Sequence, residues 1–180
     1  IVPRAPSLAV SGINFGYNLA TDITISGTVG AAMEAAAMGA PAIAVSVEVA
    51  TEYHLTGDEA SEYGPAVALA RHLAGQLLTY GAPPDVDLLN INVPSAATLE
   101  TPWRLTRLSR RRFLTPRAPD RSNDEGRVRY HTGRLAAEAE EDSDLRAVYV
   151  DGVISVTPLS LDMTARAYYG PTALDWLTQR

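Results

Sequence analysis

Short apolar runs alternate with helix-like stretches along the first half of the chain. Residues 8–10 and 42–47 are apolar runs typical of buried strands. Between them, residues 26–38 are rich in alanine, begin with the capping residue Ser26 and stop at a glycine, as a helix with two marked ends does. The pattern therefore predicts a strand, a loop over residues 13–24, a helix and a second strand, joined as a right-handed parallel crossover.

A second helix and a third strand follow. Residues 65–80 put apolar side chains near helical spacing, and Gly81 with two prolines ends this stretch. Residues 87–93 form another apolar run, which stops at Pro94. Strands that alternate with helices in this way predict an α/β fold built on a parallel sheet.

The second half of the chain has a different character. Residues 103–108 and 127–131 are typical of exposed or edge strands, and a loop rich in Pro, Arg and Asp separates them. We therefore expect a smaller extension, in the form of a hairpin arm, to begin near residue 95. A last short helix is predicted over residues 171–179.

Two local interpretations compete around residues 148–156. The Asp-Gly pair at residues 151–152, between β-branched runs, is a strong hairpin signal. Alternatively, Ser143 caps a short helix over residues 144–150, the glycine ends it, and residues 153–157 form a strand. The pattern alone favours the hairpin slightly.

Composition narrows the class of protein. The 180 residues are 46% hydrophobic and include no cysteine, which excludes disulfides, thiolate metal sites and cysteine nucleophiles and makes a cytoplasmic protein the default. No apolar stretch reaches the roughly 20 residues of a membrane span and no leader opens the chain, so we expect no membrane association. All 15 basic residues are Arg, against 21 acidic ones, a balance that argues against binding polymeric nucleic acid.

Candidate chemistry lies in the loop that follows the first predicted strand. In an open parallel sheet, ligands bind beyond the carboxyl ends of the strands, where helix N-termini present free amides. Ser26, Gly27 and Thr28 offer two hydroxyls and open N–H groups there, which suits a phosphate, although a plain N-cap is the commoner role of such a triplet. Asn14 offers a neutral oxygen to a divalent cation; taken singly, it is more often a turn residue.

Other polar groups carry weaker signals. Three histidines, His54, His72 and His131, lack metal-ligand spacing, and no hydrolase elbow or His-Glu-x-x-His motif is present. The arginines of residues 107–112 could contact phosphates of a nucleotide or of polyphosphate. A solvated arm, whose arginines pair with the acidic run over residues 138–144, is the interpretation that we favour.

Three motifs, in order along the chain, resemble those of one known family. They are Ser11-Gly12-Ile13-Asn14 with Gly16, Asn18-Leu19, Asp22 and Ser26-Gly27-Thr28-Val29; Leu89-Asn90-Ile91-Asn92-Val93-Pro94; and Ile154-Ser155-Val156-Thr157-Pro158-Leu159 with Asp162 and Thr164. They are similar to the signatures of the SurE survival proteins, which are metal-dependent nucleoside monophosphate phosphatases. The similarity extends over nearly the whole chain.

For the fold, the resemblance implies a Rossmann-like, three-layer α/β core over residues 1–94. Residues 95–180 would hold the hairpin arm, a returning strand and the C-terminal helix. The resemblance also implies a helix and then a strand after Ser143, which reverses the slight preference for a hairpin. The C-terminal segment is expected to be exchanged between the subunits of a homodimer or homotetramer.

For the activity, the resemblance implies hydrolysis of nucleoside 5'- and 3'-monophosphates and, in some members, of short polyphosphate. In the family, two aspartates of Asn-Asp-Asp-Gly, a serine and the asparagine of Ser-Gly-Ile-Asn hold a divalent cation, Mn²⁺ or Mg²⁺. Only the last ligand is present here, as Asn14. Ser26, Gly27 and Thr28 match the phosphate-binding segment, so catalytic roles are implied for Asn14, Ser26 and Thr28. Ala20 departs from the family pattern, which usually has a glycine there.

The missing aspartates keep a rival interpretation open. The chain begins at Ile1, and we expect it to be the later two thirds of a longer protein, without about 80 residues at its N-terminus. Taken by itself, it could be a catalytically silent α/β module that mediates oligomerisation or binds a nucleotide without turnover.

Overall fold

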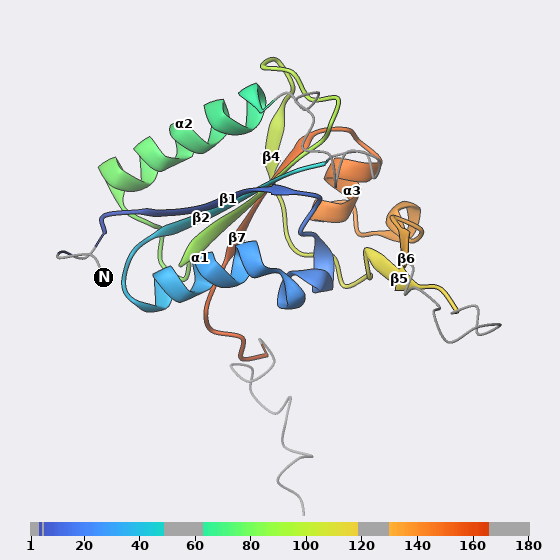
Figure 1. Cartoon of the computed structure of the whole chain (residues 1–180), viewed down its shortest axis with the longest axis horizontal. Coiled ribbons are helices and arrows are strands. Elements are labelled where there is room, and N and C mark those ends of the chain that lie inside the picture. Colours follow the sequence, from blue (N-terminus) through green and yellow to red (C-terminus); the bar gives the residue numbers. More distant parts are fainter. Residues whose placement is uncertain (1–3, 5, 49–62, 119–129, 166–180) are drawn as a thin grey trace, which may run out of the picture.

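A five-stranded mixed sheet with helices on both faces organises the chain (Figure 1). The computed structural model describes residue 4 and residues 6–48, 63–118 and 130–165. The strand order is β1-β2-β3-β7-β4, with the bounds β1 (Ala9–Phe15), β2 (Ala42–Val47), β3 (Leu88–Val93), β7 (Ile154–Leu159) and β4 (Trp103–Leu105). The first three strands are parallel, whereas β7 runs antiparallel to β3 and parallel to β4. The predicted α/β class is confirmed, although the sheet is not wholly parallel.

Two long helices, α1 (Gly27–Ala37) and α2 (Gly64–Tyr80), cover opposite faces of this sheet (Figure 1). Successive side chains of a strand point to opposite faces, so Ile43 of β2 packs with α2 while Ala44 packs with α1. Every residue of β2 and β3 is buried, as apolar runs in a doubly covered sheet require. These helices and strands confirm the elements predicted from the sequence.

Both helices end where the sequence signals place their limits. Ser26 Oγ accepts a hydrogen bond from Val29 N at 3.1 Å and so caps α1. Gly39 follows α1 with φ +90°, and Gly81 follows α2 with φ +77°. Glycine adopts such angles without the strain that a Cβ would cause.

The loop predicted over residues 13–24 is wrong at both of its ends. β1 continues through Phe15, which pairs with Val47 of β2. The two strands approach closely at Gly12, where φ is +118° and an added Cβ would lie 2.3 Å from a backbone oxygen of β2. Farther on, Ala20–Ile25 form the short 3-10 helix η1, so only the residues between Phe15 and η1 are irregular.

After Ser143 the chain forms the short helix α3 (Asp144–Tyr149) and then β7. The hairpin that the local pattern favoured is therefore wrong, and the order implied by the resemblance is confirmed. Ser143 Oγ caps α3 by accepting from Arg146 N at 3.2 Å. Gly152, with φ +65°, redirects the chain into β7, and the carboxylate of Asp151 pairs with Arg146 at 3.5 Å instead of turning a hairpin.

The strand predicted over residues 103–108 is shorter than expected and joins the edge of the main sheet as β4, because its backbone pairs with β7. A separate two-stranded sheet is formed by β5 (Leu114–Pro116) and β6 (Tyr130–Thr132), which run antiparallel, and η3 (Ala136–Glu138) follows. β6 includes residues 130–131 of the strand predicted over residues 127–131, whose first three residues lie outside the described residues, and β5 was not predicted.

Three predictions are not tested by the elements described above. The C-terminal helix predicted over residues 171–179 lies outside the described residues. The exchange of a C-terminal segment between subunits and the boundary at residue 94 stay predictions. In the described part of the chain, no helix is both long and apolar enough to cross a membrane.

Candidate functional site

Asn14 and the first turn of α1 lie at the same edge of the sheet. Asn14 pairs with Ser46 near the carboxyl end of β2. In a parallel β-α-β unit, the N-terminus of the connecting helix is found at the edge where the first strand ends. Asn14 Nδ2 donates to Gly16 O at 2.8 Å, as in a turn, and Asn14 Oδ1 accepts no hydrogen bond from the described residues. That oxygen is available to a ligand.

The first turn of α1 presents open backbone amides at this edge. Ser26 Oγ is occupied by Val29 N, so the plain N-cap interpretation of Ser26 is correct. The amides of Gly27 and Thr28 belong to the first turn, where a helix offers no internal acceptor, and no described residue accepts from them. Gly27 is exposed, and a Cβ added there would meet nothing within 4 Å, so this end of the helix is open to solvent. The turn can therefore accept an anion.

Three buried polar side chains hold Asn18 against the sheet. Asn18 N donates to Asn92 Oδ1 at 2.8 Å, and Asn18 Nδ2 donates to Ser46 Oγ at 2.8 Å. Asn18 O accepts from Asn90 Nδ2 at 2.9 Å and from Asn92 Nδ2 at 3.0 Å. Asn90, Asn92 and Ser46 are fully buried. This network fixes the segment that leads from β1 to η1.

In the sequence, Asn90 and Asn92 stand out only as parts of a motif, which indicates no contact for either of them. A signal was available: Asn90 and Asn92 alternate with apolar residues inside a buried strand, so both must face one side of the sheet. Buried amides need partners. The partner, Asn18, could have been sought in the loop that crosses that face.

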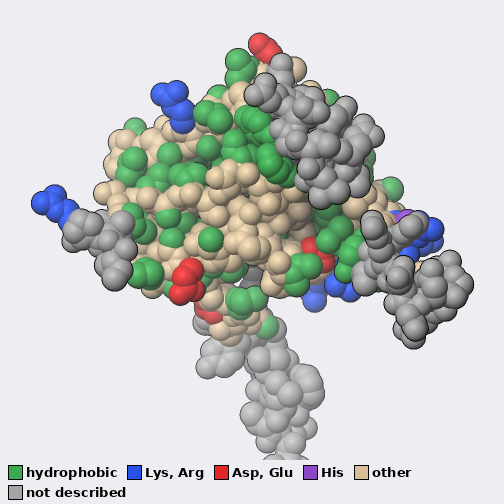
Figure 2. Space-filling view, in the orientation of Figure 1, with side chains coloured by type: hydrophobic (Ala, Val, Ile, Leu, Met, Phe, Trp, Pro, Cys, Tyr) green, Lys and Arg blue, Asp and Glu red, His purple; other side chains and the backbone are tan. Residues whose placement is uncertain are grey.

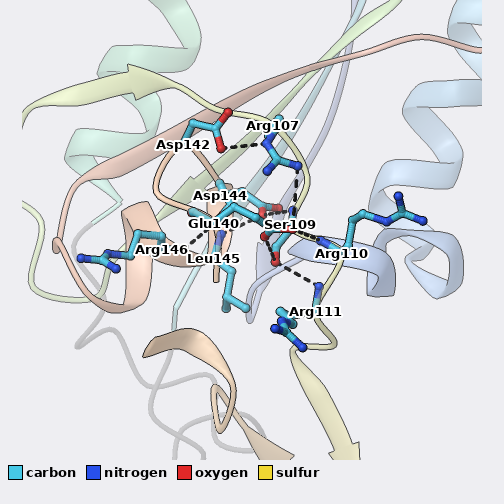
Figure 3. A network of polar contacts seen from close by, with 10 residues as sticks. Arg107, Ser109, Arg110, Arg111, Glu140, Asp142, Asp144, Leu145 and Arg146 are labelled. Carbon is cyan, nitrogen blue, oxygen red and sulfur yellow. Dashed lines mark hydrogen bonds and ion pairs between the residues drawn. The ribbon is translucent and has the colours of Figure 1, made fainter. Parts of the chain in front are cut away.

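A second anchor for the same loop is the fully buried carboxylate of Asp144 (Figure 3). Asp144 Oδ2 accepts from Ala20 N at 2.7 Å, while Oδ1 accepts from Ser109 N at 2.9 Å and from Leu145 N at 2.7 Å. Burial raises the pKa of the Asp144 carboxyl above its usual value, and these hydrogen bonds oppose the rise. Ala20 has φ +55°, which suits the glycine that the family pattern usually has there.

The arginine-rich segment is held to the acidic run, as the favoured interpretation predicted. Arg107 Nε pairs with Asp142 Oδ1 at 2.7 Å, and Arg111 pairs with Glu138 at 3.8 Å. Arg110 forms no ion pair with the described residues, and its side chain extends away from the network in Figure 3. The contacts of Arg107 and Arg111 are those of a solvated, paired arm.

The Glu140 side chain also connects the acidic run to the arginine-rich segment (Figure 3). Its carboxylate accepts from Ser109 Oγ at 2.7 Å and from Arg110 N at 3.3 Å. The hydrogen bond from Ser109, with backbone hydrogen bonds and the nearby Arg107, holds the pKa of Glu140 below its usual value.

Asp22 joins the candidate site to the separate β5–β6 sheet. This carboxylate is only 7% exposed, and its Oδ2 accepts from Leu114 N at 2.6 Å. Arg112 Nε lies 3.8 Å from Asp22 Oδ1. This contact fixes η1 to the β5–β6 sheet, and no local sequence pattern indicated it.

Tyr17 and Glu48 form a polar contact at the carboxyl edge. Tyr17 Oη donates to Glu48 Oε2 at 2.9 Å, and burial raises the pKa of Tyr17 far above its usual value. The Tyr17 ring lies edge-on to Phe113 and Tyr149, each with a centroid distance of 6.0 Å. The sequence did not indicate this contact.

The residues described do not form a metal centre. Among residues 6–48, 63–118 and 130–165, no three His, Asp or Glu side chains gather as metal ligands would. Asn14 supplies one neutral oxygen, whereas a hard cation takes six or more oxygens. His72 is exposed on α2 and His131 is exposed in β6, far apart in the sequence, while His54 lies outside the described residues.

An apolar groove lies away from the candidate site. A groove of about 240 Å³ lies on the α2 side of the sheet and is lined mostly by apolar side chains, with Arg71 as its charged member. Figure 2 shows hydrophobic side chains gathered over α2 and the neighbouring strands, with charged side chains towards the outline. The polar groups that suit an anion lie on the other face, with α1.

Comparison with known proteins gives consistent matches. The family model described as "Survival protein SurE" matches residues 1–115. The chain is 45% identical over 160 residues to the 5'-nucleotidase SurE of Thermococcus gammatolerans, covering 88% of this chain and 60% of that protein. It is 48% identical over 166 residues to the 5'-nucleotidase SurE of Methanocella arvoryzae, covering 90% and 62%. The chain thus spans about three fifths of the length of these relatives.

A solved structure agrees with these matches. The crystal structure of the SurE protein from Aquifex aeolicus is similar with a TM-score of 0.72 and 32% sequence identity, covering 98% of this chain and 67% of that one. The α/β fold, the motifs at the carboxyl edge and the family model all indicate the same relationship. The chain belongs to the SurE survival protein family.

Proposed function

We propose that this chain forms part of a phosphomonoesterase that hydrolyses nucleoside 5'-monophosphates to nucleoside and phosphate. The observation that carries the proposal is the open first turn of α1, whose Gly27 and Thr28 amides lie at the carboxyl edge with Asn14. An anion-binding turn at this place suits a phosphate ester. The relatives named 5'-nucleotidase SurE support the choice of a nucleotide as the substrate.

Each candidate residue has a distinct part in this proposal. The amides of Gly27 and Thr28, with the Thr28 hydroxyl, bind phosphate oxygens. As water attacks phosphorus and the ester oxygen leaves, they stabilise the negative charge on the remaining oxygens. Ser26 acts as a positioning residue, because its hydroxyl already accepts from Val29 N. Asn14 Oδ1, an acceptor on the neighbouring strand, would help to hold the cation that accompanies the phosphate.

Metal dependence is a separate part of the proposal. The family resemblance implies a divalent cation, Mn²⁺ or Mg²⁺, with Asn14 as one ligand. Because no three acidic or histidine side chains gather among the described residues, we expect further ligands to come from elsewhere in the functional protein. Activity towards 3'-monophosphates and short polyphosphate, assembly as a homodimer or homotetramer, and a cytoplasmic location are likewise proposed on the resemblance alone.

Replacement of Gly27 by proline tests the phosphate-binding turn. Proline is tolerated at the first helical position and Ser26 already has φ −81° and ψ +122°, so Gly27→Pro removes one amide with little strain. We expect kcat/KM for AMP to fall by about 10²–10³ when phosphate release is measured with added Mn²⁺ or Mg²⁺. Gly30→Ala, in the same helix and with open space around its Cβ, is the control and should change it less than about twofold.

Two outcomes would contradict this assignment. Equal kcat/KM for Gly27→Pro and wild type would remove the turn from the site. Phosphate release no greater than the blank, in the protein as it is encoded, would overturn the hydrolytic function; AMP binding by calorimetry without product would then favour a nucleotide-binding module.

A further inference from the structure

The carboxylate of Glu48 lies at the same edge and on the same face of the sheet as the candidate phosphate site. Glu48 directly follows β2, and its amide still donates to Val93 O at 3.0 Å, so it continues the strand. Alternate strand residues share a face, which places Glu48 with Ser46 and Ala44 on the side covered by α1. Ser46 pairs with Asn14. Glu48 is therefore one strand away from the end of β1.

The carboxylate is held from two sides through one oxygen. Glu48 Oε2 accepts from Tyr17 Oη at 2.9 Å and from Ser95 Oγ at 3.1 Å. Tyr17 follows β1 and Ser95 follows β3, so the loops of both neighbouring strands fix this carboxylate. Glu48 Oε1 accepts no hydrogen bond from the described residues, and the side chain is half-buried.

The surroundings of Glu48 suit a ligand that donates hydrogen bonds. No arginine among the described residues pairs with it. An unpaired carboxylate repels a phosphate but accepts strongly from hydroxyl groups. The hydroxyl groups of a sugar are donors of this kind.

We infer that Glu48 Oε1 accepts hydrogen bonds from the ribose hydroxyls of the nucleotide whose phosphate lies at Gly27 and Thr28. The inference rests on the proposed function and adds a preference for ribonucleotides over deoxyribonucleotides. In β-α-β nucleotide sites, the phosphate lies at the helix N-terminus and an acidic residue about 20 positions on, at the end of the second strand, binds the ribose hydroxyls. Glu48 has this position, 20 residues after Thr28.

Tyr17 is the positioning residue of this subsite. Its hydroxyl occupies Oε2 and so leaves Oε1 towards the ligand. The rings of Phe113 and Tyr149 fix the Tyr17 ring edge-on. Removing the hydroxyl without the ring should loosen the carboxylate and weaken, but not abolish, the discrimination between sugars.

The test compares AMP, 2'-deoxy-AMP, 3'-deoxy-AMP and p-nitrophenyl phosphate as substrates for wild type and Glu48→Ala. A hydrogen bond to a charged group contributes about 1.5–3 kcal/mol, so we expect wild type to prefer AMP over at least one deoxy analogue by about 10–150-fold in kcat/KM. Glu48→Ala should reduce this ratio to about one while p-nitrophenyl phosphate hydrolysis changes less than about twofold. Tyr17→Phe should give an intermediate ratio, and the exposed Glu100→Ala is the control.

The possible outcomes distinguish a failure of the sugar subsite from a failure of the proposed hydrolytic function. An unchanged AMP preference in Glu48→Ala, or no preference in wild type, overturns the sugar subsite while the phosphatase stands. If wild type releases no phosphate from any substrate, the proposed function fails. Calorimetry with AMP and the two deoxy analogues then decides the inference alone, because a ribose subsite predicts that Glu48→Ala weakens binding of AMP to the level of an analogue.

Discussion

Buried polar residues hold the loop between β1 and α1 in place from a distance. Asn92 binds the backbone of Asn18 across 74 residues of sequence, and Asp144 binds that of Ala20 across 124. Partners so far apart leave no local pattern, so the sequence alone indicated Asn14, Ser26, Gly27 and Thr28 but neither anchor. Asp144 satisfies buried backbone amides, and an unpaired buried amide costs about 1–3 kcal/mol.

Asp144→Asn tests the larger anchor. In this variant an NH₂ group replaces one of the two oxygens, so it faces the N–H of Ala20 or those of Ser109 and Leu145 and cannot accept from them. We therefore expect the free energy of unfolding to fall by about 1–3 kcal/mol. Urea denaturation measures this change. Asp142→Asn, which breaks only the exposed pair with Arg107, should cost less than about 1 kcal/mol. Equal losses in the two variants would contradict the anchoring role.

Elements with local signals were predicted well, and elements that depend on distant pairing were not. Caps, breakers or continuous apolar runs mark α1, β2, α2 and β3, and the observed bounds of these elements lie close to the predicted ones. The end of β1 and the short strand β5 depend on their partners β2 and β6, which no window of sequence includes. The Asp-Gly pair at residues 151–152 wrongly predicted a hairpin. Instead, Ser143 caps α3, and this helix packs against β3 and β7 of the sheet.

The contact between residues 109–110 and Glu140 predicts a pH dependence. The pKa of Glu140 is held below its usual value, so the folded state binds the proton less readily than the unfolded state does. The stabilisation is present at neutral pH and lost as the pH falls from about 4 through the lowered pKa. Urea denaturation should find wild type more stable than Glu140→Gln by about 0.5–1 kcal/mol at pH 7, and equal to it near pH 2–3.

A matched variant controls this measurement. The side chain of Glu141 is exposed and forms no hydrogen bond or ion pair with the described residues, so Glu141→Gln should be as stable as wild type at both pH values. A Glu140→Gln difference that stays constant with pH would contradict the hydrogen-bonded carboxylate.

Across the whole molecule, the second half of the chain supports the candidate site in the first half. β3 supplies Asn92, α3 supplies Asp144, and Leu114 of the β5–β6 sheet binds Asp22 in η1. The first turn of α1 is thus presented by a rigid frame, as an anion site requires. The motifs indicated the candidate residues of this site, whereas the frame and the Glu48 contact are seen only in the fold.

Amide chemical shifts measured during a titration of the ¹⁵N-labelled chain with AMP test the phosphate-binding turn most directly. Inorganic phosphate and adenosine serve as separate arms, and Gly75 in α2 is the reference amide. We expect the Gly27 and Thr28 amides to shift with AMP and with phosphate, but not with adenosine, while the Gly75 amide stays unchanged. Amides of Gly27 and Thr28 that remain unmoved while AMP binds elsewhere would contradict it.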